Sequence, residues 1–145
     1  MTNPKQLINK NWNVIFVCWL IASTSALGSL FFSEIMDFPP CALCWYQRAF
    51  MFPLAIILLI GLFPYDKSVI KFSLPLAVGG LGFAIYHWLV YSGFIPENLQ
   101  PCSQGVSCSE KYIDLFGFIT IPMLSLISFS IIVSLLLVLL RRDYR

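Results

Sequence analysis

Residues 41–63 read CALCWYQRAFMFPLAIILLIGLF, an apolar run whose only charge is Arg48. A helix needs about 20 mainly apolar residues to cross the hydrocarbon core of a bilayer. The run is continuous and lacks the alternation of apolar and polar residues that a membrane β-strand requires. It therefore predicts a membrane-spanning helix with one arginine inside it.

Three further stretches have the same character, at about residues 12–32, 69–91 and 118–140. Hydrophobic residues make up 59% of the 145, and charged residues only 11%, whereas a soluble domain carries about 25% charged residues. The surplus of apolar side chains indicates a lipid environment. We expect an all-α chain with one membrane domain over residues 1–145, an integral membrane four-helix bundle whose first partner is the lipid bilayer.

The first stretch also has features of a cleaved secretory signal, because Lys5 and Lys10 precede it and alanines lie near its end. Its apolar run is longer than the roughly 7–15 residues of the apolar core of a signal sequence. We expect an uncleaved first helix.

Basic residues gather on one side of the expected bundle. Four spans place both termini and the loop at residues 64–68 together, and of the nine lysines and arginines only Arg48 and Lys111 fall on the other side. The positive-inside rule then makes both termini cytoplasmic, so the loops 33–40 and 92–117 face outward. The net charge of +2 is too small to indicate nucleic acid as a partner.

Of the five cysteines, all but Cys18 fall on the expected outer side, where disulfides persist. Cys41 and Cys44 form a C-x-x-C on the first turn of a helix, directly after Pro39 and Pro40. The free N–H groups and the dipole at a helix start favour a thiolate. A bridge across so small a loop stabilises little, which favours redox exchange over a short structural bridge or half of a zinc site. We expect no metal.

Arg48 shares a helix face with the C-x-x-C, since Cys41, Cys44 and Arg48 are three and then four residues apart. An arginine inside a membrane is costly and usually marks a functional site, and a quinone would offer carbonyl oxygens to its guanidinium. The alternative is an arginine that extends to the headgroups. His87 lies at a similar depth in the third span and is a candidate second polar partner or proton donor. Its alternative role is a hydrogen bond between helices.

A second cysteine pair, Cys102 and Cys108, lies in the outer loop between the third and fourth spans. Pro96, Pro101 and Gly105 mark this loop as irregular and exposed. Such a loop can approach both an external protein and the C-x-x-C.

These features resemble the disulfide bond formation protein B (DsbB) family. The resemblance rests on Pro-Cys-Ala-Leu-Cys-Trp-Tyr-Gln-Arg at residues 40–48, on the following loop pair, and on Gly-Phe-Ile-Thr-Ile-Pro at residues 117–122. It extends from about Trp12 to Leu140. The spacing between Cys102 and Cys108 is short and resembles the compact, BdbC-like forms often found in Gram-positive bacteria.

The resemblance implies a quinone-dependent protein-dithiol oxidoreductase in the bacterial cytoplasmic membrane, with both cysteine pairs on the outer face. It implies a redox-active Cys41–Cys44 disulfide beside a quinone, either ubiquinone or menaquinone, which Cys44 contacts. Arg48 matches the quinone-site arginine of the family. His87 is a weaker match to the quinone site of the family.

The same resemblance implies a redox-active Cys102–Cys108 disulfide that reoxidises a DsbA-like thioredoxin-fold thiol oxidase outside the cytoplasmic membrane. Cys102 is the implied site of the mixed disulfide with that partner. The respiratory chain would then reoxidise the quinone pool.

Three other classes of protein share some of these features. A vitamin K epoxide reductase-like enzyme has similar parts, but its loop pair precedes the C-x-x-C. A non-enzymatic membrane scaffold with two structural disulfides would leave Arg48 without a role. A metal carrier would need four reduced, converging thiolates and has no obvious route across the span.

Overall fold

The computed structural model describes residues 4–96 and 120–143. Its helices are α1 (Pro4–Glu34), α2 (Ala42–Leu62), α3 (Ser68–Tyr91) and α4 (Ile121–Asp143). No strand occurs in either of these two ranges, and all four helices are long and apolar enough to cross a membrane. The predicted fold class, all-α with four membrane-length helices, is confirmed.

The helix bounds differ from the expected spans mainly at the ends. α1 begins at Pro4, well before the apolar run, because a helix continues into polar residues where no breaker stops it. α3 continues through Pro75, as membrane helices often do. α4 begins at Ile121, and the expected start of this span at residue 118 lies outside the described residues.

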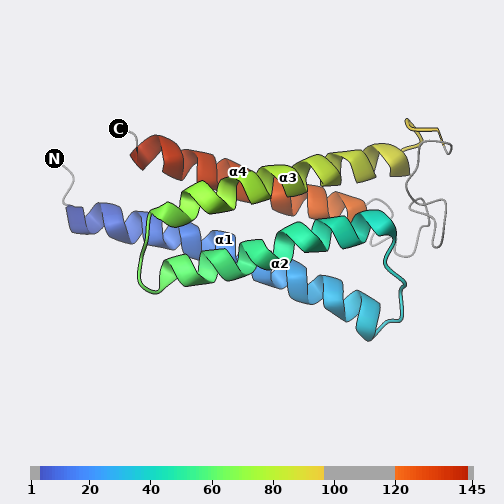
Figure 1. Cartoon of the computed structure of the whole chain (residues 1–145), viewed down its shortest axis with the longest axis horizontal. Coiled ribbons are helices and arrows are strands. Elements are labelled where there is room, and N and C mark those ends of the chain that lie inside the picture. The colour runs from blue at the N-terminus through green and yellow to red at the C-terminus, as the bar shows by residue number, and fades with distance from the viewer. Residues whose placement is uncertain (1–3, 97–119, 144–145) are drawn as a thin grey trace.

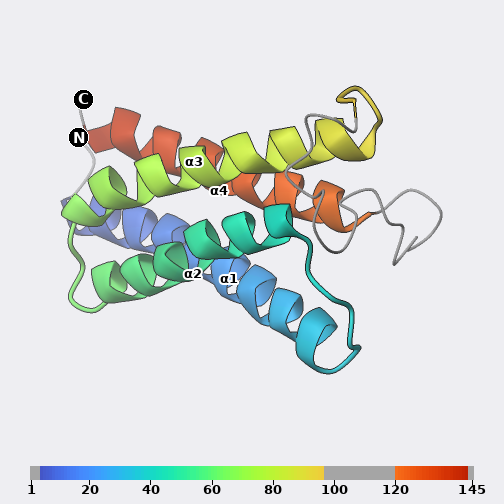
Figure 2. The same ribbon diagram turned by 45° about the vertical axis from the view of Figure 1, so that its right-hand side comes forward.

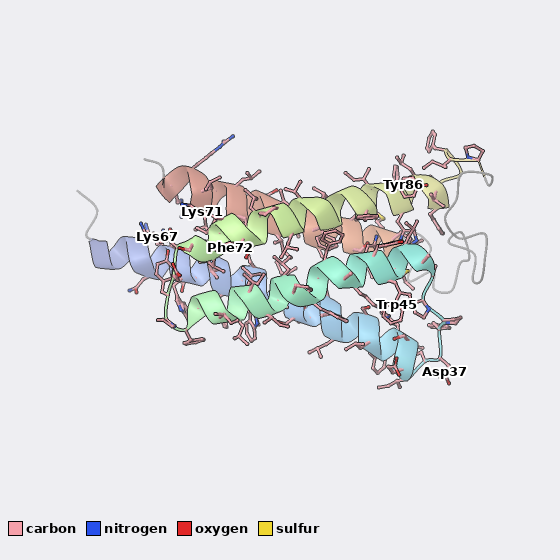
Figure 3. All side chains as sticks on the ribbon, viewed as in Figure 1. Asp37, Trp45, Lys67, Lys71, Phe72 and Tyr86 are labelled. Carbon is pink, nitrogen blue, oxygen red and sulfur yellow. The ribbon has the colours of Figure 1, made fainter. Side chains whose placement is uncertain are left out.

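The helices form a ring in which α1 and α3 each pack against both α2 and α4. Figures 1 and 2 show neighbouring helices running in opposite directions, so that α1 begins and α4 ends beside the α2–α3 connection. The α1–α2 connection lies at the opposite end of the bundle. Figure 3 places Lys67 and Lys71 at the first end and Asp37, Trp45 and Tyr86 at the second. We call this second end the Cys41 end.

Apolar side chains lie both inside the bundle and on its outside. Leu54, Leu58 and Phe129 are fully buried between the helices. Leu27 and Ile60 on the outer faces remain about two thirds exposed, at 67% and 66%. An outer surface of this kind is unfavourable in water and suits contact with lipid.

Gly80 of α3 allows the close approach of α4, because a Cβ atom added there would overlap the Phe129 ring. We expect Gly80→Ala to lower the stability of the protein by about 1–3 kcal/mol, the usual cost of overpacking a core. The measurement is thermal unfolding in detergent, followed by circular dichroism. Gly82→Ala is the matched control, since a Cβ at that position meets open space. Equal losses in the two variants would contradict the packing role of Gly80.

Candidate active site

The thiol pair forms the start of α2. Cys41 is the N-cap residue, with the extended backbone (φ −70°, ψ 167°) that follows the two prolines. The Cys44 backbone N–H donates to the Cys41 sulfur at 3.4 Å, which satisfies one of the free N–H groups of the helix start. The two sulfur atoms are 2.9 Å apart and both cysteines are free thiols. This arrangement brings the two sulfurs close enough for disulfide chemistry with little movement of the backbone.

His87 approaches the same pair from α3. Its Nε2 atom lies 3.8 Å from the Cys41 sulfur, and its side chain is only 2% exposed. Cys41 precedes the membrane-length helix, and its pKa is lowered, first by the hydrogen bond with the Cys44 thiol and then by the His87 ring, against the opposing effect of burial. The contacts of Cys41 with the Cys44 thiol and the His87 ring therefore favour its thiolate form.

Arg48 is buried one turn further along α2 and is held against α1. Its Nε atom donates to the Ser29 hydroxyl oxygen, and its Nη2 atom donates to the Ser29 carbonyl oxygen at 2.6 Å. The guanidinium carbon also lies 5.4 Å from the centre of the Trp45 ring, within the range of a cation–π contact. Only 8% of Arg48 is exposed, so the charge sits within the bundle.

A cavity of about 340 Å³ opens beside the thiol pair. Its wall comes from α1, the α1–α2 connection, α2 and α4, and one residue of α3. The polar side chains of α2 and α3 that line it are Gln47, Arg48 and His87, and both thiols of the C-x-x-C line it as well. Most of the remaining wall is apolar, including Phe52, Ile121 and Phe129. A cavity of this size and character is typical of small-molecule sites.

Two residues that line this cavity each have a buried polar atom without a hydrogen-bond partner among the described residues, namely Gln47 Nε2 and His87 Nδ1. A buried polar group that lacks a partner costs about 1–3 kcal/mol. A ligand with carbonyl oxygens would offer the Gln47 amide an acceptor. The orphaned amide therefore indicates a cavity suited to a mainly apolar ligand with a few hydrogen-bond acceptors.

The structure brings together four of the residues singled out from the sequence, because Cys41, Cys44, Arg48 and His87 all line this cavity. Cys102 and Cys108 lie outside the described residues. Sequence reasoning gave no role to Gln47 or to Ser29. The sequence could have indicated a role for Gln47, since an uncharged polar residue within an apolar membrane span is itself energetically costly. Ser29 had none, because small hydroxyl residues are common where membrane helices pack.

The protein is therefore a bundle of four membrane-length helices with a C-x-x-C at a helix start, next to a largely apolar cavity that contains an arginine. Residues 10–139 match the family model described as "Disulfide bond formation protein DsbB". This chain belongs to the DsbB family, as the residues at 40–48 and 117–122 suggested.

Individual relatives agree with the family match. A probable disulfide formation protein of Metapseudomonas resinovorans is 46% identical over 141 residues, which are 97% of this chain and 97% of that protein. The disulfide bond formation protein C of Bacillus subtilis is 48% identical over 121 residues, 82% of this chain and 86% of the relative. A probable disulfide formation protein of Deinococcus radiodurans is 43% identical over 132 residues, 84% and 85% of the two chains. No solved structure matches the chain.

Membership of this family implies disulfide-bond formation at a membrane, and hence an oxidoreductase that exchanges disulfides with a thiol partner.

Proposed function

We propose that this chain is a membrane thiol oxidase that reoxidises a DsbA-like, thioredoxin-fold partner outside the cytoplasmic membrane and passes the electrons through Cys41 and Cys44 to a membrane quinone. The observation that carries the proposal is the position of the C-x-x-C. Its two thiols line a largely apolar cavity. Arg48 also lines this cavity, and its buried guanidinium, which is bonded to Ser29, is a hydrogen-bond donor.

The cavity suits a quinone. Its apolar wall fits a quinone ring, Arg48 and the orphaned Gln47 amide are donors for carbonyl oxygens, and Arg48 favours negative charge at those oxygens. When bound, a quinone supplies a two-electron acceptor next to the thiol pair. Within the chain, Arg48 and Gln47 would orient that acceptor. His87 would form a hydrogen bond with the Cys41 thiol through Nε2.

We assign the exchange with the partner to the loop pair. A partner thiolate attacks Cys102 in an oxidised Cys102–Cys108 pair, and Cys108 leaves as a thiolate. The second partner thiolate then attacks the partner sulfur of this mixed disulfide, which frees Cys102. The partner departs with a disulfide, and the loop pair keeps the two electrons as two thiols.

The electrons then move to the C-x-x-C by a second exchange of the same kind. A loop thiolate attacks the oxidised Cys41–Cys44 pair to form a mixed disulfide within the chain, and the other loop thiolate resolves it. The loop pair is oxidised again, and Cys41 and Cys44 become thiols. The positive end of α2 favours this step because it stabilises the thiolate that leaves.

Anaerobic quinone reduction by the purified protein tests this function directly. The protein is supplied with a reduced thioredoxin-fold dithiol protein and with either a ubiquinone or a menaquinone analogue. We expect catalytic reduction of at least one quinone, with one partner disulfide formed per quinone consumed. No turnover with either quinone, together with cysteine pairs that stay oxidised under mild reductant, would instead support a scaffold with two structural disulfides.

Ser29 is expected to position Arg48 for the quinone. Ser29→Ala removes the acceptor of the Arg48 Nε bond but keeps the backbone acceptor. The quinone KM should rise roughly 2- to 10-fold, the value of one hydrogen bond, while kcat changes little. Ser33→Ala is the matched control, because Ser33 lines the same cavity but donates to Leu30 of its own helix. An unchanged KM in Ser29→Ala would remove this role from Ser29.

A further inference from the structure

We propose that the reduced protein binds a thiophilic divalent cation, Zn²⁺ or Cd²⁺, through Cys41, Cys44 and His87. This site goes beyond the proposed function, since binding needs only reduced thiols and neither a quinone nor a protein partner. The sequence alone did not indicate it, because His87 is 46 residues from Cys41 and the C-x-x-C supplies only two ligands.

The three ligand atoms are already close to a coordination geometry. The two sulfurs and a ring nitrogen of His87 lie within 4.8 Å of one another. Bonds of about 2.3 Å to sulfur and about 2.0–2.1 Å to nitrogen in a tetrahedral site place the ligand atoms roughly 3.5–3.8 Å apart. The sulfur–nitrogen separation lies at the lower end of this range, and the distance of 3.8 Å between Cys41 Sγ and His87 Nε2 exceeds it by only roughly 0.2–0.3 Å. The sulfurs, at 2.9 Å, need to separate by roughly 1 Å, which a small rotation of the half-buried Cys44 side chain provides.

The charges also suit a divalent cation. The ion displaces the two thiol protons, which pass to water, and no electrons move. Two thiolates and a neutral imidazole then form an uncharged cluster, which a buried site tolerates far better than a bare cation. Arg48 is a neighbouring positive charge on the same helix. The charge of Arg48 repels a bound cation unless two thiolates neutralise that cation. Both thiols must therefore lose their protons for the ion to bind.

The position of His87 supports the same site. Its side chain is 2% exposed. Its Nε2 atom lies 3.8 Å from the Cys41 sulfur. A buried imidazole directed at a thiol pair is the third ligand that a Cys₂His site requires. Three protein ligands leave a fourth position open, as in zinc sites that bind water or another small ligand.

Occupancy by the metal and formation of the disulfide exclude each other, because both use the lone pairs of the same two sulfurs. A bound ion would therefore hold the C-x-x-C in its reduced state and block turnover. This consequence, unlike the binding itself, rests on the proposed function.

Cadmium titration of the reduced full-length protein in detergent tests the site, with the ultraviolet thiolate-to-cadmium charge-transfer band as the readout. The loop thiols are removed by Cys102→Ser and Cys108→Ser, so that they do not compete for the ion. We expect one Cd²⁺ per chain, and displacement of the cadmium by Zn²⁺. His87→Gln should weaken binding by at least about 10- to 100-fold, since even outer-sphere partners of a metal cost that much when lost. His87→Cys should restore tight binding with a stronger charge-transfer band.

Cys18→Ala is the matched control for nonspecific thiol binding, because Cys18 lies in the core away from the C-x-x-C, and it should leave the titration unchanged. Equal cadmium affinity with and without His87→Gln, both in the Cys102→Ser, Cys108→Ser background, would overturn the site. So would a band that survives Cys44→Ser, or the absence of a band in the reduced protein. Quinone reduction is measured separately on metal-free protein, so its failure would count against the proposed function and leave the titration result standing.

Discussion

Cys44→Ser should abolish quinone reduction by the reduced partner. A serine hydroxyl neither forms a disulfide nor carries the electron pair that a thiolate passes on, so the route from Cys41 to the cavity is interrupted. We expect turnover to fall by at least about 10³-fold, as when other enzymes lose a nucleophile. The measurement is anaerobic quinone absorbance with a reduced thioredoxin-fold dithiol protein in excess.

The same variant also separates the two halves of the proposed relay. Cys102 and Cys108 remain, so an oxidised loop pair should still oxidise about one equivalent of partner in a single turnover, without quinone consumption. Cys18→Ala is the control for loss of a thiol that has no proposed role, and it should keep full turnover. Continued quinone reduction by Cys44→Ser would show that Cys44 is not the residue through which the electrons leave.

Arg48→Ala should produce the second large effect, a rise in the quinone KM with the cysteine chemistry intact. Arg48 is the one charged side chain on the wall of the cavity within the described residues. Hydrogen bonds from a charged donor contribute about 1.5–3 kcal/mol each, which corresponds to a rise of roughly 10- to 150-fold in the KM. Steady-state kinetics over a range of quinone concentrations measure this rise.

Two further arginine variants make the test specific. Arg141→Ala removes an exposed arginine from the last turn of α4 and should leave the kinetics unchanged. Arg48→Lys keeps the charge but loses the planar fork that bonds both Ser29 oxygens, so its KM should lie between those of wild type and Arg48→Ala. If Arg48→Ala left the KM unchanged, the arginine would serve the packing of α1 on α2 instead.

The sequence determined the helices of this protein because hydropathy is a local property. Each span is an apolar run long enough to cross a bilayer. For α2, this run alone was sufficient to predict a membrane-spanning helix from the sequence. The same local reasoning placed Cys41, Cys44 and Arg48 on one face of α2, since the periodicity of a helix fixes which of its own residues are neighbours. All three line the same cavity.

The residues that α1 and α3 bring to that face depend on how the helices pack. His87 reaches Cys41 across 46 residues of sequence, and Ser29 holds Arg48 from 19 residues away. These contacts depend on how each helix is rotated and shifted against its neighbours, which close contacts such as that of Gly80 with Phe129 control. In a water-soluble bundle the polar face of each helix would have revealed this rotation. Here lipid-facing and core-facing sides are both apolar, so the sequence specifies the helices but not the faces they turn toward one another.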